Sequence, residues 1–275
     1  MTHKKKCLYP KKSLMNPLSA EGIIPLARSF DTAGPMTRTV RDAAVLLDVL
    51  ARSSTTASLS DSVSALRIGV ARKGFFDDLQ ADVASCIEEA LAVITKLVAE
   101  VREVHFEVGG HRTIFNAEIY EYHEQVAAKA PELYGPHTLA RIRKCAGISA
   151  TAYIRAQREL ETQRRAAESV FEEVNLVITP TVPVAAPRIS ELQRLGEAKL
   201  RDFETKHLLR NTSPFSVLYW PSISVPCGFT REGLPVGMQI SGKPGEDDNV
   251  LRLAYAYEQA TRWYLYAPRI ASRVS

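Results

Sequence analysis

The sequence predicts an α/β fold in which a mixed β-sheet is covered by helices on both sides. Short apolar runs typical of strands alternate with longer segments of helical periodicity. Those longer segments can serve as crossovers between parallel strands, which short turns cannot do. With 275 residues, 45% of them hydrophobic and 24% charged, the chain has the composition of a globular protein and can bury a sizeable core.

The first half of the chain is expected to contain a strand–helix–strand unit. Residues 66–71 (LRIGVA) are predicted to form a buried strand, residues 81–99 an amphipathic helix, and residues 101–108 a returning strand. Ahead of this unit, Thr39 is expected to cap a helix. The spacing from Thr39 to Asp42 is that of a capping box, with Asp in place of the usual Glu or Gln.

The second half is expected to be mainly helical, with one isolated strand and a C-terminal hairpin. Pro180 stops the isolated strand, and a Pro-rich loop follows over residues 180–195. Residues 112–145 are expected to be mostly helical, with interruptions at Pro131 and at Gly135-Pro136. Further helices are expected at residues 149–174 and 247–262, residues 197–218 are expected to be mostly helical, and strands are expected at residues 176–179, 222–227 and 236–241.

The charge and hydropathy of the sequence argue against nucleic acid and membranes as partners. The net charge of +4 is small for this length, and a nucleic-acid site needs a clustered basic face, so neither nucleic acid nor a membrane is an expected partner. No run of about 18 apolar residues is present to span a bilayer. Residues 1–20 are expected to be a disordered Lys-rich segment, and residues 21–270 are expected to form a domain. A localisation signal or a nucleic-acid-binding arm is the weaker interpretation of residues 1–20. The lysines of this segment are Lys4, Lys5, Lys6, Lys11 and Lys12.

The cysteines favour neither a metal site nor a disulfide framework. Cys7, Cys86, Cys145 and Cys227 are scattered, without CxxC spacing and without a neighbouring His pair. We therefore expect a reducing compartment, the cytoplasm, with no metal and no cofactor.

Several segments carry a resemblance to a known family. They are residues 22–44 (GIIPLARSFDTAGPMTRTVRDAA), 176–183 (LVITPTVP), 211–215 (NTSPF), 221–228 (PSISVPCG) and 233–240 (GLPVGMQI). In content, order and approximate spacing they resemble the amidase-signature family. The resemblance extends over most of the chain and implies the C-terminal portion of the amidase-signature fold.

The resemblance also implies an activity, the hydrolysis of carboxamide C–N bonds. In this family a Lys acts through a bridging cis-Ser to activate a nucleophilic Ser, because a serine hydroxyl is a weak nucleophile without a base. These residues lie in a Gly/Ser-rich stretch of the form GGSSGGS…GSD before the block that starts here at Gly22. The residues before Gly22 contain neither motif. We therefore expect an N-terminally truncated chain without catalytic residues, inactive alone, that binds a small-molecule amide if the N-terminal half is supplied.

Four residues within the matching blocks are candidates for lining a substrate pocket. Asp31 and Arg38 flank a tight turn, and both also have a structural interpretation, pairing with backbone or with each other. Thr179 precedes the prolines at the strand end, where the chain turns into a loop of the kind that carries sites. Gln239 interrupts an apolar strand, so its amide needs a partner; it either faces the cleft or is a satisfied structural amide.

For the other serine, cysteine and glutamate candidates, the sequence favours a structural role over a catalytic one. Ser222 and Ser224 alternate along a strand, which favours packing or cross-strand bonding. Cys227 could pair with His207 or His137 only if one of them lay within hydrogen-bond reach. Three glutamates of the helical segment after residue 112 are expected to form a solvated face: Glu118, Glu121 and Glu124.

Two alternatives to a general amidase stay open. One is the glutaminase subunit of a tRNA-dependent amidotransferase, which uses the same chemistry to release ammonia from glutamine. The other is a non-catalytic protein, either a pseudoenzyme or a subunit that complements a separately encoded N-terminal half. Burial is the argument for the complementing subunit, because strands without their neighbours would leave an unpaired sheet edge and an exposed apolar face, which promote association. A homo-oligomer is also open.

Overall fold

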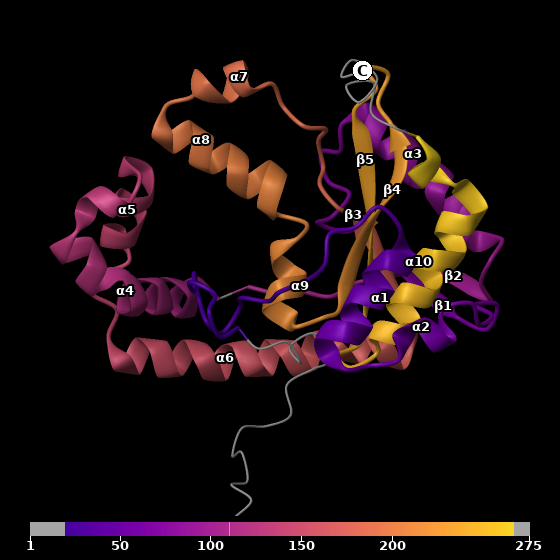
Figure 1. Ribbon diagram of the computed structural model, residues 1–275, viewed down its shortest axis with the longest axis horizontal. Helices are drawn as coiled ribbons and strands as arrows, with labels where there is room; N and C mark the ends of the chain where they lie inside the picture. Colours follow the sequence, from indigo (N-terminus) through magenta and orange to yellow (C-terminus); the bar gives the residue numbers. More distant parts are fainter. Residues whose placement is uncertain (1–19, 110, 267–275) are drawn as a thin grey trace, which may run out of the picture.

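The computed structural model describes residues 20–109 and 111–266 and contains the predicted mixed sheet (Figure 1). In the described part of the chain the strands form one five-stranded sheet of order β2-β1-β3-β5-β4. The first three are parallel, and β5 runs antiparallel to both β3 and β4. The strands are β1 (Arg67–Ala71), β2 (Glu100–Val104), β3 (Leu176–Pro180), β4 (Ser222–Phe229) and β5 (Pro235–Gly242).

The helices begin largely where the sequence predicts. Thr39 caps the first helix by accepting a hydrogen bond from the backbone N–H of Asp42, and Ser149 caps the longest one in the same way. The helices are α1 (Val40–Ala51), α2 (Thr55–Ser58), α3 (Ala81–Thr95), α4 (Arg112–Lys129), α5 (Pro136–Lys144), α6 (Ala150–Glu168), α7 (Ile189–Gln193), α8 (Glu197–Phe203), α9 (Ser213–Leu218) and α10 (Asp247–Thr261). Shorter helical turns are η1 (Pro131–Leu133), η2 (Ser169–Glu172), η3 (Glu204–Leu209, a π-helical turn) and η4 (Trp263–Leu265).

The β1–α3–β2 segment is the predicted crossover unit, and β1 also pairs in parallel with β3. Its close packing depends on Gly69. A Cβ added at this position would lie 2.6 Å from a methyl group of Val104 and 3.1 Å from one of Val174. A side chain would therefore push apart strand β2 and the segment that leads into β3.

Helices cover both faces of the sheet, as predicted. Alternate residues of β3 point to opposite faces, so Ile178 belongs to one apolar cluster and Val177 to another. The first cluster lies under α1, α3 and α10. The second lies under η2, α9 and the end of α6, and it includes the tilted ring pair of Phe106 and Trp220, whose centroids are 4.7 Å apart.

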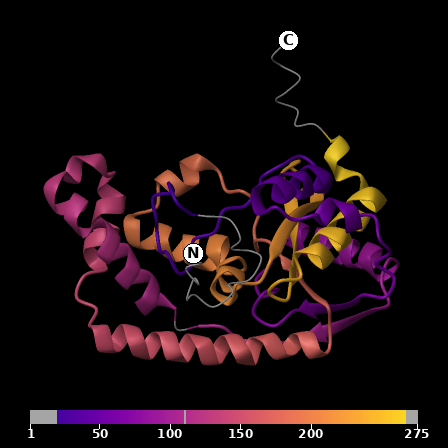
Figure 2. The same ribbon diagram turned by 60° about the horizontal axis from the view of Figure 1, so that its bottom comes forward.

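A third apolar cluster lies in a helical arm made by α4, α5 and the first half of α6. Helix α6 joins this arm to the sheet (Figure 2). Its Ala156 and Leu160 pack in the arm cluster, whereas its Ala167 packs against the sheet. The same long helix therefore takes part in two separate cores.

Two further predictions from the sequence concern a membrane-spanning helix and the Lys-rich N-terminal segment. No helix in the described part is long and apolar enough to cross a membrane. The Lys-rich segment predicted at residues 1–20 lies, apart from Ala20, outside the described residues.

Candidate active-site pocket

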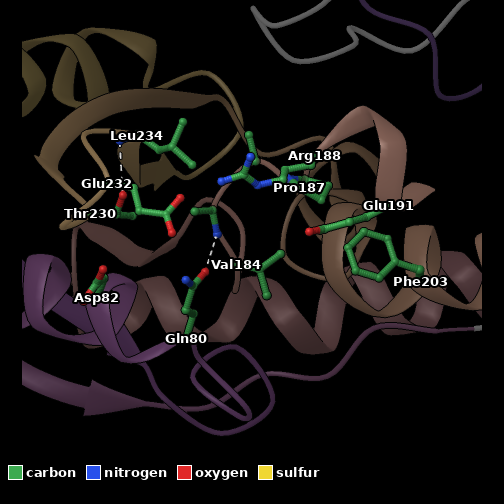
Figure 3. A pocket seen from close by; sticks show the side chains of 12 residues that line it. Gln80, Asp82, Val184, Pro187, Arg188, Glu191, Phe203, Thr230, Glu232 and Leu234 are labelled. Carbon is green, nitrogen blue, oxygen red and sulfur yellow. Dashed lines mark hydrogen bonds between the residues drawn. The ribbon is translucent and has the colours of Figure 1, made fainter. Parts of the chain in front are cut away.

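A pocket of about 310 Å³ opens at the C-terminal end of β3, where three segments far apart in sequence meet (Figure 3). These segments are the start of α3, the loop that follows β3, and the turn of the β4–β5 hairpin. Loops at the ends of strands are where binding and catalytic groups are commonly placed. The lining residues are Gln80, Asp82, Val184, Ala185, Ala186, Pro187, Arg188, Glu191, Phe203, Thr230, Glu232 and Leu234.

Hydrogen bonds from the start of α3 fix the rim of this pocket. The Oε1 atom of Gln80 accepts a hydrogen bond from the backbone N–H of Ala185 at 2.9 Å, and its own N–H donates to the Pro183 carbonyl at 2.9 Å. Asp82 accepts from the backbone N–H of Arg231 at 3.0 Å and pairs with its Nε at 3.2 Å. The start of α3 therefore holds both the loop after β3 and the turn of the β4–β5 hairpin in place.

The pocket wall combines both signs of charge with apolar surface. In Figure 3, Arg188 and Glu191 lie on one side of the pocket, and Glu232 and Asp82 lie on the other. Phe203 adds an aromatic ring to the wall. This mixture suits a small polar molecule that carries both hydrogen-bond donors and acceptors.

None of the four residues predicted to line a pocket is among the lining residues of this one, but two of them meet inside the sheet. Thr179 and Gln239 are register partners on β3 and β5, and both are buried. The Nε2 atom of Gln239 lies 3.4 Å from Thr179 Oγ1 and 3.4 Å from the backbone carbonyl oxygen of Asn211. The isolated amide therefore has the hydrogen-bond partners that its apolar strand requires.

Asn211 is a buried amide that the sequence placed in a matching block without assigning it a role. Its Nδ2 donates to the carbonyl oxygens of Phe75 and Pro180, both at 2.9 Å. The side chain thereby links the segment after β1 to the end of β3. Its Oδ1 accepts a hydrogen bond from Arg210 Nε at 3.2 Å.

The serines of β4 form cross-strand hydrogen bonds, which confirms the structural interpretation. Ser222 Oγ lies 2.8 Å from Ser241 Oγ, and Ser224 Oγ lies 2.7 Å from Thr181 Oγ1. A Cβ at Gly237 would come within 2.9 Å of both the Ser224 and Thr181 hydroxyl oxygens, so glycine leaves room for this pair. Hydroxyl–hydroxyl pairing does not supply the base that a nucleophilic serine needs.

Asp31 and Arg38 lie in the segment before α1. Asp31 accepts hydrogen bonds from the backbone N–H groups of Leu26 and Ala27, at 2.8 and 3.0 Å, and so closes a local turn. It also lines a second pocket, of about 460 Å³, together with Arg28. Arg38 is exposed just before the α1 cap. Whether either residue touches substrate stays a prediction.

The described cysteines are held as neutral thiols. Cys86, Cys145 and Cys227 are free and buried. Burial, followed by the nearby Cys86 and Glu89, raises the pKa of Cys227 to about 12. The thiolate, which is the reactive form, is therefore disfavoured at neutral pH. Within residues 20–109 and 111–266, no cluster of three or more His, Cys, Asp or Glu side chains could hold a metal ion.

Glu118 differs from its prediction as part of a solvated face. Its carboxylate is half-buried and accepts hydrogen bonds from the backbone N–H of Ser29 at 2.7 Å, from the Ser29 hydroxyl, and from the Tyr153 hydroxyl at 2.8 Å. Burial, followed by the hydrogen bond to Glu118, raises the pKa of Tyr153 to about 12. Glu118 thus ties the segment before α1 to α4 and α6, whereas Glu121 and Glu124 are exposed as predicted.

Comparison with known protein sequences gives consistent matches along the chain. A family model described as Amidase matches residues 11–251. An amidase of Pseudomonas putida is 30% identical over 278 residues, covering 94% of this chain and 59% of the relative. The A subunit of a glutamyl-tRNA(Gln) amidotransferase from Methanosarcina mazei is 30% identical over 292 residues, covering 91% of this chain and 60% of the relative. The chain therefore spans about three fifths of the length of these relatives.

Solved structures give the same result for the fold. A crystal structure of an amidase superposes with a TM-score of 0.76 at 29% identity, covering 90% of this chain and 57% of the other. A 6-aminohexanoate cyclic dimer hydrolase in complex with substrate superposes with a TM-score of 0.81 at 23% identity, covering 94% and 61%. At this lower identity the likeness concerns the fold alone.

Proposed function

This chain belongs to the amidase-signature family, and we propose that it forms the pocket-bearing portion of a hydrolase that cleaves carboxamide C–N bonds. The observation that carries the proposal is the family match over residues 11–251, which includes the strands and loops that build the pocket at the end of β3. The reaction would convert an amide into a carboxylic acid and ammonia or an amine.

We assign the chemical step to residues outside this pocket. Serine hydroxyls at the nearby strands pair with other hydroxyls, and the Cys227 thiol is buried and protonated. Neither arrangement supplies the activated nucleophile that amide cleavage requires. The Ser–cis-Ser–Lys group implied by the family resemblance would come from the Gly/Ser-rich stretch that the first 21 residues do not contain.

It follows that the 275-residue chain alone should not hydrolyse amides. The test is to purify it and measure ammonia release from glutamine, an aliphatic amide and an aromatic amide. The same chain fused to the uncovered portion of the Pseudomonas putida amidase serves as the reconstituted comparison. Turnover by the 275 residues alone would refute the assignment of the chemical step to the Gly/Ser-rich stretch; turnover by the fusion alone would support it.

A second candidate is the glutaminase subunit of a tRNA-dependent amidotransferase. Relatives described as the A subunit of glutamyl-tRNA(Gln) amidotransferase are 30% identical to this chain in Methanosarcina mazei and in Myxococcus xanthus. In the fusion assay, release of ammonia from glutamine but not from the simple amides would favour this candidate. Activity on simple amides without glutaminase activity would favour the general amidase.

The non-catalytic alternative gives a different pattern. A pseudoenzyme would be a stable monomer on its own, and no added segment would restore ammonia release. A complementing subunit would be inactive alone and active with its partner.

A further inference from the structure

Residues 186–209 form one side of the pocket at the end of β3. This stretch, which we call the α7–α8 segment, contains α7, α8 and the π-helical turn η3. It supplies Arg188, Glu191 and Phe203 to the pocket wall. In Figure 3, Arg188 and Glu191 lie across the pocket from Glu232, which belongs to the turn of the β4–β5 hairpin. A movement of the α7–α8 segment would therefore change the width of the pocket.

The first end of the α7–α8 segment is anchored just before the segment begins. Gln80 Oε1 accepts a hydrogen bond from the backbone N–H of Ala185, and the backbone N–H of Gln80 donates to the carbonyl oxygen of Pro183, both at 2.9 Å. Beyond this anchor, Ala186 and Pro187 lead into α7. Small residues at the end of an element commonly absorb the change of backbone angle in a hinge. Because proline fixes its own φ, such a change falls mainly on the two alanines.

The second end of the α7–α8 segment is anchored directly after the π-helical turn. Buried Asn211 donates from Nδ2 to the carbonyl oxygens of Phe75 and Pro180, both at 2.9 Å. Immediately before this anchor, residues Glu204–Leu209 form the π-helical turn, a rare geometry that often occurs at functional sites. A change of this turn to α-helical geometry would rotate α8 relative to the anchor.

The two sides of the pocket carry opposite charges that are not paired. Within the described part of the chain, Arg188, Glu191 and Glu232 take part in no ion pair. Asp82 is already paired with Arg231, at 3.2 Å from its Nε. The guanidinium of Arg188 and the carboxylate of Glu232 attract each other across the pocket, so a movement of the α7–α8 segment toward the hairpin turn would let them pair. An exposed ion pair changes an equilibrium constant by up to about fivefold, so the closed form would reopen readily.

We propose that the α7–α8 segment is a hinged lid that closes over the pocket at the end of β3, with Arg188 paired to Glu232 in the closed form. The structure shows the open form, and the two anchored ends restrict the movement to the segment between them. This inference rests on the proposed function, because the pocket is the one that would hold the amide. Closure would exclude bulk water from a bound amide and strengthen its polar contacts with the pocket wall.

The test measures the opening of the pocket in the 275-residue chain alone. One spin label is attached at Ile189→Cys on α7, where the native side chain is 75% exposed, and the other at Ala81→Cys at the exposed start of α3. The native cysteines of the described part are buried, and Cys7 is replaced by serine in every variant. Double electron–electron resonance then gives the distribution of distances between the two labels.

We expect two populations of distance, of which the shorter is the closed lid. Arg188→Gln and Glu232→Gln should each lower the ratio of closed to open form by roughly two- to fivefold, and added salt should lower it in the wild type. The exchanged pair, Arg188→Glu with Glu232→Arg, should restore the ratio, which a purely structural role of either residue would not predict. Asp202→Asn is the matched control, because it removes an exposed ion pair with Lys206 on α8 outside the pocket wall, and it should leave the ratio unchanged.

Three results would overturn the proposal: a single distance in the wild type, a ratio that neither neutralising variant changes, or no recovery in the exchanged pair. The same labels in the fusion with the uncovered portion of the Pseudomonas putida amidase separate the lid from the activity. Two distances in a fusion that releases no ammonia from any amide would contradict the proposed function and leave the lid intact. A single distance in a fusion that does release ammonia would overturn the lid and leave the proposed function intact.

Discussion

The sheet and the helical arm are held together by different kinds of interaction. The cluster under α3 and α10 consists of apolar side chains, with Ile178, Ile240 and Leu253 fully buried. The arm has its own apolar cluster, which includes Ala27 and Phe30 of the segment before α1. The same segment is also hydrogen-bonded to the carboxylate of Glu118 and the ring of His123. The sheet region is stabilised mainly by burial of apolar area, whereas the attachment of the arm combines apolar packing with specific polar contacts.

The polar attachment of the arm is directional. His123 Nε2 donates to the carbonyl oxygen of Pro25 at 2.9 Å, and its Nδ1 accepts from the Tyr134 hydroxyl at 2.9 Å. Each bond requires a particular geometry, whereas apolar contacts tolerate small shifts. We therefore expect the arm to detach locally before the sheet unfolds.

The largest effect should come from the sheet. Ile178→Ala should lower the free energy of unfolding by about 3 kcal/mol, because it leaves a cavity at a fully buried strand position. Urea titration followed by circular dichroism gives this value. Leu160→Ala in the arm is the matched control and should reduce hydrogen-exchange protection in α4, α5 and α6 more than in the strands. Equal loss of protection in arm and sheet for both variants would mean that they form one cooperative unit.

A smaller and more local effect is expected at Glu118. Glu118→Ala removes the acceptor for Ser29 and Tyr153 and should cost about 2 kcal/mol in local stability of the arm. Hydrogen exchange in α4 and in the segment before α1 measures it. The pKa of Tyr153, now about 12, should fall part of the way toward its ordinary value, because burial remains as the larger cause.

The exposed Glu124 on the same helix provides the control for Glu118. Glu124→Ala should change neither arm protection nor the ultraviolet titration of tyrosine. If Glu118→Ala behaved like Glu124→Ala, the polar attachment of the arm would be unimportant.

Asp247 is an exception within the apolar sheet region, and removing its charge should stabilise the protein. It is buried at the start of α10, its Oδ2 has no hydrogen-bond partner, and burial raises its pKa to about 6. The unfolded chain releases this proton at a lower pH, so stability falls as pH rises from about 4 to 6 and stays reduced above. Asp247→Asn should therefore gain about 2 kcal/mol at pH 7 and little at pH 4, measured by thermal unfolding at both pH values. A gain of equal size at both pH values would exclude ionisation as the cause.

The smallest effect is expected at Asp48, where α1 meets α2. Burial acts to raise its pKa, but hydrogen bonds from Thr56, Thr55 and Ser53 together lower it below the ordinary value. This contribution to stability is present above the ordinary pKa of about 4 and is lost as pH falls below it. Asp48→Asn should cost about 1 kcal/mol at pH 7 and less at pH 2, measured by thermal unfolding. Asp61→Asn at an exposed position is the matched control and should leave the thermal stability at pH 7 close to that of the wild type.

The sheet could be predicted from the sequence because its signals are local. The runs LRIGVA and LVIT, and the hairpin residues around Gly233, each fit within a few residues. Gln239 was a candidate because an amide in an apolar strand must find a partner, and the structure supplies Thr179 and Asn211. Its contact with substrate stays a prediction.

The arm attachment and the pocket rim could not be predicted, because their partners are distant in sequence. Glu118 bonds to a residue 89 positions away, and His123 to one 98 positions away. Gln80 holds a loop 105 positions away. On a helix or at its start, such side chains have the same spacing as solvated ones, and only the tertiary fold distinguishes them.

Helix α6 connects the helical arm rigidly to the sheet. At 1.5 Å per residue, its 19 residues make a rod of roughly 28 Å with one end in the arm and the other packed under the sheet. If it pivots near Ala167, a rotation of about 5° moves the far end by roughly 2 Å. Hydrogen bonds tolerate less displacement than that, so the bond from the Tyr153 hydroxyl of α6 to Glu118 of α4 helps to fix the angle of the rod.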